Sequence, residues 1–202
     1  YFDLEQSIRP ALERGDITYY LQPKVDLKTG EVTRAEALVR WIDPEKGMIP
    51  IVSFLPSLEE NGLIEEVDLC IFEKICAQIN QWIQKYGRKI HISVNLSRCA
   101  FDYRYFFKDY VERYDKSPCP KDCIEFELLE SIVLNQVDRV KEVVSEIKDF
   151  GFSCSLDDFG SGYSSFSVLT NSDISTLKID RSLFRNVTDS REKILLRHVL
   201  QT

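Results

Sequence analysis

The sequence predicts an α/β fold in which a mainly parallel sheet curves into a barrel. Short runs rich in β-branched and aromatic residues alternate with helical stretches along the chain. This alternation is typical of strand–helix–strand units. The predicted strands are Ile17–Val25, Val32–Trp41, Lys89–Leu96, Cys123–Leu129, Phe152–Leu156 and Ile174–Ile179.

Two amphipathic helices are predicted between these strands, each with one apolar face and a glycine as its stop signal. The first helix ends before Gly87, and its apolar face consists of Val67, Ile71, Ile75, Ile79 and Ile83. The second ends before Gly151, and its apolar face consists of Val133, Val137, Val140, Val144 and Ile147. An earlier helix contains Pro10, which leaves its boundaries open.

The first two predicted strands are separated only by Asp26–Glu31. This connection is too short for a parallel crossover and fits an antiparallel hairpin. We therefore expect the barrel to begin with an antiparallel strand.

Composition restricts the class of protein. The chain has 202 residues, of which 44% are hydrophobic and 29% charged, which is ordinary for one globular domain. The net charge of −7 opposes binding to DNA or RNA polymers. Six cysteines without a CxxC pair and only two histidines give no support to a zinc module or a disulfide scaffold. We expect reduced thiols and a cytoplasmic location, either in a cytoplasmic protein or in the cytoplasmic domain of a membrane-anchored parent. Because the first residue is Tyr1, we expect the chain to be excised from a longer multidomain protein.

Polar side chains occur near the carboxyl ends of the predicted strands, where buried parallel strands should be apolar. They are Glu36, Asn95, Glu127, Asp157 with Asp158, and Lys178. In a barrel these strand ends converge on one mouth. Several carboxylates cannot share a pocket unless protons or cations neutralise them. Carboxylates and a carboxamide without thiolates predict a hard-oxygen site for Mg²⁺ or Mn²⁺.

Other interpretations of single residues stay open at this point. Glu36 can form a structural ion pair with Arg40, and Asn95 can be a turn residue. The segment Asp157-Asp158-Phe159-Gly160 is similar to a kinase metal site, but the chain has no Gly-rich loop before a Val-Ala-Ile-Lys strand and no His-Arg-Asp motif. A protein kinase is therefore excluded.

The motifs together resemble the EAL domain, the cyclic-di-GMP phosphodiesterase family. The matching blocks, in family order, are Tyr20-Leu21-Gln22-Pro23, Glu36-Ala37-Leu38-Val39-Arg40-Trp41, Phe54-Leu55-Pro56, Ser93-Val94-Asn95-Leu96-Ser97, Glu125-Phe126-Glu127-Leu128-Leu129-Glu130-Ser131, Asp157-Asp158-Phe159-Gly160-Ser161-Gly162-Tyr163-Ser164-Ser165 and Leu177-Lys178-Ile179-Asp180-Arg181-Ser182. The resemblance covers essentially the whole chain. It implies a TIM-like (β/α)8 barrel that hydrolyses cyclic-di-GMP to linear pGpG in bacterial second-messenger signalling.

The resemblance also assigns roles to the matching residues. It implies two Mg²⁺ or Mn²⁺ ions with Glu36, Asn95, Glu127 and Asp157 as ligands, where Asp157 bridges the ions and Asp158 helps to hold the second. Lys178 would orient the attacking water or offset charge. Glu130 would anchor the loop Phe159–Ser165 over the metals, and the ligand contacts would come from Gln22, Leu38 and Arg40.

Two features depart from the family pattern. Leu129 stands where the family usually has Thr, which removes a hydroxyl beside Glu130. The chain ends at Thr202 after about six strands, whereas a complete barrel typically needs ~250 residues. We therefore expect the barrel to be truncated, the seventh and eighth strands to be missing, and this fragment alone to be inactive.

Rival functions and partners follow from the same pattern. The main alternative is a catalytically inactive receptor that binds cyclic-di-GMP, and a third hypothesis is a purely structural or dimerisation element. The family often dimerises, so a homodimer is one expected partner. A regulatory or diguanylate-cyclase-like domain is expected in the same parent chain.

Overall fold

The computed structural model describes residues 2–102, 105–160 and 173–184, and its centre is a seven-stranded sheet. The strands follow the order β1 (Ile17–Val25), β2 (Val32–Asp43), β4 (His91–Asn95), β5 (Ile124–Leu129), β6 (Ser153–Phe159) and β7 (Thr176–Ile179), with β3 (Gly47–Ile49) paired to β2. The β1–β2 pair is antiparallel, and each later pair on this path is parallel. The predicted α/β fold with an antiparallel first strand is confirmed.

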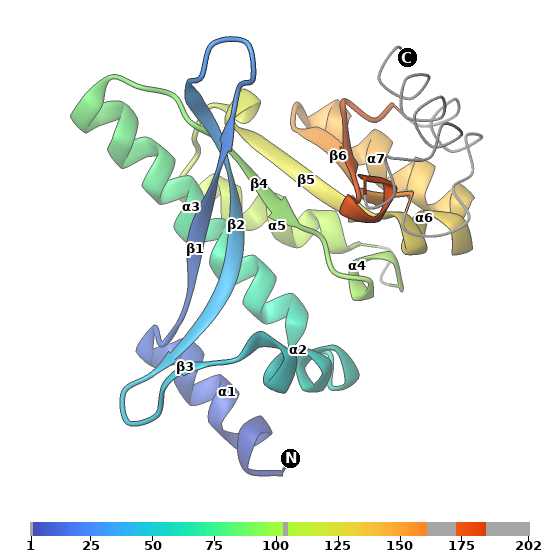
Figure 1. The fold of residues 1–202 in the computed structure, drawn as a ribbon. Helices are drawn as coiled ribbons and strands as arrows, with labels where there is room; N and C mark the ends of the chain where they lie inside the picture. The colour runs from blue at the N-terminus through green and yellow to red at the C-terminus, as the bar shows by residue number, and fades with distance from the viewer. Residues whose placement is uncertain (1, 103–104, 161–172, 185–202) are drawn as a thin grey trace.

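The β1–β2 hairpin has the turn that its sequence predicts. The Asp26 side chain accepts hydrogen bonds from the backbone N–H groups of Lys28 and Thr29, and Gly30 has a φ of +73°. Such Asx turns satisfy backbone donors that the strands leave unpaired. Figure 1 shows this long hairpin projecting along one side of the sheet. The hairpin places β2 beside the parallel strand β4 and leaves β1 at the edge of the sheet.

The helices connect the strands and cover the sheet (Figure 1). They are α1 (Phe2–Arg14), α2 (Ile51–Glu60), α3 (Ile64–Tyr86), α4 (Cys99–Asp102), α5 (Phe106–Lys116), α6 (Glu130–Asn135) and α7 (Val137–Phe150), with short 3-10 turns η1 (Lys121–Cys123) and η2 (Arg181–Phe184). Helix α3 ends before Gly87, whose φ of +64° lies in the left-handed region that favours glycine. The two amphipathic patterns thus marked real helices.

Several elements differ from the sequence prediction, and most strand boundaries shift by one or two residues. The second predicted helix is two helices, because the chain breaks at Gln136 between α6 and α7. Strand β6 continues past Leu156 to Phe159, so Asp157 and Asp158 lie in the strand and not after it. Strand β3 was missed, since three residues with a leading glycine are too short to show alternation.

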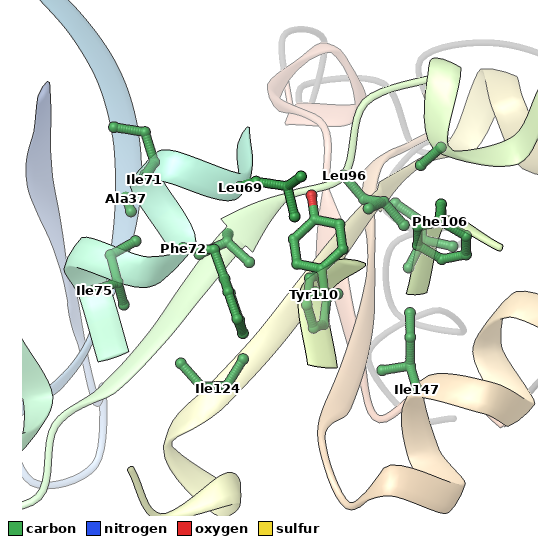
Figure 2. Close-up of a cluster of buried hydrophobic side chains, with 14 of the residues drawn as sticks. Ala37, Leu69, Ile71, Phe72, Ile75, Leu96, Phe106, Tyr110, Ile124 and Ile147 are labelled. Carbon is green, nitrogen blue, oxygen red and sulfur yellow. The ribbon is translucent and has the colours of Figure 1, made fainter. Parts of the chain in front are cut away.

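The main core lies between one face of the sheet and the helices α3, α5 and α7. Phe126 on β5 stacks on Phe72 of α3 at 5.7 Å between ring centroids, and Tyr110 of α5 meets Phe126 edge-on at 5.1 Å. Figure 2 shows Phe72 and Ile75 projecting from α3 toward the strands, Tyr110 near the centre of the cluster, and Ile147 of α7 farther along, below Phe106. This aromatic layer holds the parallel strands in place. The opposite face of the same strands is therefore left for polar residues.

The sheet is open in the described part of the chain. Strands β1 and β7 are its two edges, and no pairing joins them within residues 2–102, 105–160 and 173–184. The described strands therefore form an open sheet and not a closed barrel.

Candidate metal centre

Polar residues occupy alternate positions on the inner face of the sheet, opposite the aromatic core. One row consists of Glu36, Asn95, Glu127, Asp157 and Lys178, and a second row, two residues earlier on each strand, consists of Arg34, Ser93, Glu125, Ser155 and Thr176. Successive side chains of a strand point to opposite faces, so the members of both rows share the inner face of the sheet. The strand ends bring together residues that are far apart in sequence.

Three carboxylates in the first row form a compact cluster. Glu36, Glu127 and Asp157 each offer one oxygen, and these oxygens lie within 4.8 Å of one another. Glu127 is only 1% exposed, while Glu36 and Asp157 are partly buried. Oxygen donors that converge in this way suit a hard divalent cation. The residues present therefore fit Mg²⁺ or Mn²⁺.

Lys178 lies among the same three carboxylates. Its Nζ donates hydrogen bonds to Glu36 Oε2 at 2.9 Å and to Asp157 Oδ2 at 2.7 Å, and also to Glu127 Oε2. Burial opposes the charged form of Lys178, but the three acceptors outweigh burial and raise the pKa of its ammonium. Lys178 thus remains a cation and offsets part of the negative charge of the cluster.

Glu127 is also held from its other side by Lys24 of β1, at 2.6 Å from Oε1. Burial alone would raise the pKa of the Glu127 carboxyl, but the hydrogen bonds from Lys178 and Lys24 hold that pKa below its usual value. Lys24 is not among the residues predicted from the sequence. It lies two residues after Gln22, so strand alternation from a predicted site residue would have found it.

Asn95 adjoins the cluster at the end of β4. Its Nδ2 donates to Glu36 Oε1 at 3.3 Å, and the side chain is exposed. Of the five residues predicted as metal ligands, the structure brings Glu36, Asn95, Glu127 and Asp157 together. The alternative ion pair between Glu36 and Arg40 does not occur among the described residues. Glu36 instead contacts Lys178 and Asn95.

Asp158, the fifth predicted ligand, lies outside the three-carboxylate cluster. The pairing of β6 with β7 shifts between Leu156 and Phe159, and Asp158 has a φ of 56° in the left-handed region. A bulge of this kind re-aims side chains and is often found beside active sites. Burial, followed by the charges of Asp157 and Asp180, raises the pKa of the Asp158 carboxyl. A cation beside Asp158 would relieve this repulsion.

Glu130 is the first residue of α6, and its side chain is buried. Its Oε2 accepts a hydrogen bond from the backbone N–H of Gly160 at 3.0 Å. Gly160 has a φ of +91°, which a residue with a side chain would adopt only with strain. The start of the predicted loop is thus tied to Glu130 in the presence of Leu129, while residues 161–165 of that loop lie outside the described part.

The predicted ligand-contact residues line the β1–β2 side of the site. Gln22 pairs with Glu36 across the hairpin, and Leu38 and Arg40 continue the same face of β2. The Arg40 guanidinium lies 5.6 Å from the centre of the Tyr20 ring and donates to the Val39 carbonyl at 2.7 Å. These residues form a strip that leads away from the carboxylates.

A cavity of about 320 Å³ adjoins the strand ends. Leu38, Asn95 and Leu129 line it from the sheet side, and Asp68 lines it from α3. The Oδ2 atom of Asp68 is buried and has no partner among the described residues. Burial raises the pKa of the Asp68 carboxyl to about 7, although hydrogen bonding to Ser97 opposes the shift.

The comparison with protein families agrees with the geometry. The EAL domain family matches residues 5–202. The chain belongs to the EAL domain family. The fold of this EAL domain is of the TIM-like type, with a sheet that is open among the described residues.

Named relatives of this EAL domain occur in several bacteria. It is 34% identical over 190 residues to the cyclic di-GMP phosphodiesterase PdeR of Escherichia coli, covering 93% of this chain and 28% of that protein. It is 31% identical over 183 residues to the signaling protein YkoW of Bacillus subtilis, covering 91% of this chain and 23% of that protein. The chain thus spans about a quarter of the length of these relatives.

Solved EAL structures have the same fold. The phosphodiesterase PaMucR in complex with c-di-GMP superposes with a TM-score of 0.86 at 30% identity, covering 96% of this chain and 78% of that chain. The FimX EAL domain of Pseudomonas aeruginosa bound to c-di-GMP has a TM-score of 0.87 at 18% identity, covering 98% of this chain and 80% of that chain. The second likeness concerns the fold alone. In the described part of this EAL domain, no helix has the length and apolarity needed to span a bilayer.

Proposed function

We propose that this EAL domain hydrolyses cyclic-di-GMP to pGpG with the help of two Mg²⁺ or Mn²⁺ ions. The observation that carries the proposal is the convergence of Glu36, Glu127 and Asp157 within 4.8 Å, with Lys178 among them. The family and its relative named a cyclic di-GMP phosphodiesterase support the choice of substrate.

The chain's own residues then divide the work. Glu36, Asn95, Glu127 and Asp157 would hold the ions, with Asp158 assisting at the second. When bound, such ions lower the pKa of a nearby water and stabilise the charge that develops on the phosphate. Lys178, which stays protonated, orients the attacking water or offsets that charge.

The strip on β1 and β2 would bind the dinucleotide. Arg40 has the planar fork of donors that suits a phosphate, and it lies on the same face of β2 as Glu36. Leu38 lies between Glu36 and Arg40 on β2, and Gln22 lies opposite Glu36 on β1; both would position the rest of the ligand. Glu130 would support the site by holding the backbone at Gly160.

The domain is proposed to act within a longer cytoplasmic protein. The relatives are several times longer than this chain, which supports a regulatory or diguanylate-cyclase-like domain in the same parent. Residues 1–202 alone are proposed to be inactive. The open sheet among the described residues supports this proposal. A homodimer remains a further proposed partner.

The test is hydrolysis by the full-length parent protein. Wild type, Glu36→Ala and the control Glu45→Ala are incubated with cyclic-di-GMP and Mn²⁺, and pGpG is followed by chromatography. Glu45 is an exposed carboxylate in the turn after β2, so it is a matched control. We expect wild type and Glu45→Ala to form pGpG and Glu36→Ala to lose this activity. Binding by the wild type without turnover would instead support a receptor, and hydrolysis by Glu36→Ala at the wild-type rate would show that the metal assignment is wrong.

A further inference from the structure

Lys24 divides the two oxygens of Glu127 between different neighbours. Lys24 Nζ lies 2.6 Å from Glu127 Oε1, whereas Glu127 Oε2 accepts from Lys178. The first contact faces β1, and the second faces the cluster with Glu36 and Asp157. One carboxylate thus has an anchored oxygen and an oxygen directed at the site.

Lys24 is itself held by the second polar row. Its Nζ donates to Ser93 Oγ at 2.7 Å and lies 4.0 Å from Glu125 Oε1. Glu125 is in turn held from its other oxygen by Thr176 at 3.1 Å and by Arg34 at 3.5 Å. An ammonium has three donors, and Lys24 directs two of them to Ser93 of β4 and Glu127 of β5. The position of Lys24 is therefore determined by two strands besides its own.

From this geometry we propose that Lys24 is a positioning residue for the metal site. By holding Oε1 of Glu127, Lys24 leaves only Oε2 available, so Glu127 binds a divalent ion through a single oxygen. The inference rests on the proposed metal site and adds a residue that the family motifs do not include. Groups that hydrogen-bond a metal ligand from behind orient it, and their loss typically weakens metal binding or activity by about 10–100-fold.

A purely structural ion pair is the competing explanation. In that case Lys24 would stabilise the fold by neutralising a buried carboxylate, and its removal would lower stability without changing how an ion is bound. Two measurements separate the positioning role from the structural role: the affinity for the metal ion and the coordination geometry around it. If Lys24 is only structural, its removal changes neither quantity in the molecules that remain folded.

The first test measures Mn²⁺ binding to the full-length protein without nucleotide, by electron paramagnetic resonance and calorimetry. Lys24→Met is compared with Lys28→Met, since Lys28 is an exposed lysine in the turn of the same hairpin. We expect Lys24→Met to bind Mn²⁺ about 10–100-fold more weakly and with an altered Mn²⁺ spectrum, and Lys28→Met to match the wild type. Equal affinities and spectra in all three proteins would overturn the inference.

The second test needs no variant and decides the question even where Lys24→Met does not fold. A crystal structure of the Mn²⁺-loaded wild type should show Glu127 bound through one oxygen, with Lys24 on the other. Both Glu127 oxygens on the ion, with Lys24 turned away, would overturn the inference. These outcomes are separate from the proposed function, because Mn²⁺ binding that depends on Lys24 can occur in a protein that does not hydrolyse cyclic-di-GMP, and hydrolysis can occur without such dependence.

Discussion

Phe126 and Glu127 are adjacent on β5 and almost equally buried, at 0% and 1% exposure, but they face opposite sides of the sheet. Phe126 packs among aromatic rings from α3 and α5, where contact area and shape decide the energy. Glu127 is surrounded by ammonium groups and other carboxylates, where each charge needs a partner. The comparison shows that the face toward the helices stabilises the fold, while the opposite face carries the charged side chains that we propose for catalysis.

The largest effect should come from the aromatic face. Phe126→Ala should lower the free energy of unfolding by about 3–5 kcal/mol, because it removes a fully buried ring and leaves a cavity. Urea unfolding measures the change. Val25→Ala is the control, since Val25 is a strand residue that is 55% exposed. A similar loss in both variants would contradict the division between the two faces.

The next effect concerns Lys178 on the polar face. Lys178→Met should reduce cyclic-di-GMP hydrolysis by about 10²–10³-fold, since it removes a charge aimed at the reacting group. The same change should tighten Mn²⁺ binding, because Lys178 contacts the very oxygens that an ion would use. Rates of pGpG formation and Mn²⁺ titrations measure the two effects. Loss of both hydrolysis and Mn²⁺ binding would show that Lys178 organises the carboxylates instead of competing with the ion.

Asp68 is a charge on the helix side of the sheet and should act through pH. The pKa of the Asp68 carboxyl in the folded protein, about 7, lies above its ordinary value of 3.8, so the folded state holds the proton more tightly. Stability therefore falls as pH rises from about 4 to 7, and Asp68→Asn should remove a penalty on the order of 2–4 kcal/mol at pH 8. Thermal unfolding from pH 4 to 8 measures this, with the fully exposed Asp138→Asn as control. A constant difference between Asp68→Asn and wild type at every pH would contradict the assignment.

The smallest effect is expected at Leu129, the last residue of β5. Leu129 precedes the first residue of α6 and provides no side-chain cap, whereas Thr is a favourable residue there. Leu129→Thr should raise stability by about 0.5–1 kcal/mol, and turnover should be preserved or raised. Unfolding curves and pGpG formation measure both, and a large loss of turnover would contradict the role given to this position.

Much of the fold could be predicted because local patterns are strong in this chain. The β1 strand has the predicted bounds Ile17–Val25, since its short hairpin turn left no other arrangement. Helix α3 follows a four-residue apolar period and ends at Gly87. The division between α6 and α7 was not predicted because apolar residues recur on both sides of Gln136, and the break lies in the backbone of Gln136, whose φ of −139° and ψ of 49° are not helical.

The convergence of four predicted residues could be expected from the sequence, whereas their individual contacts could not. Motif positions identified Glu36, Asn95, Glu127 and Asp157, and the structure brings these residues together. The same motif included Asp158, but Asp158 lies at the bulge in β6 and outside the three-carboxylate cluster. Lys24 was missed because its relation to Glu127 spans 103 positions and depends on sheet register.

The sequence by itself determined which residues face the helices and which face the inner side, because side chains alternate along a strand. It also determined the family, through motifs whose order and spacing are preserved. Only the tertiary structure decided that Lys178 and Lys24 hold opposite oxygens of one buried glutamate. Such pairings depend on strand order, register and local bulges, which arise when the sheet assembles and are absent from any single segment.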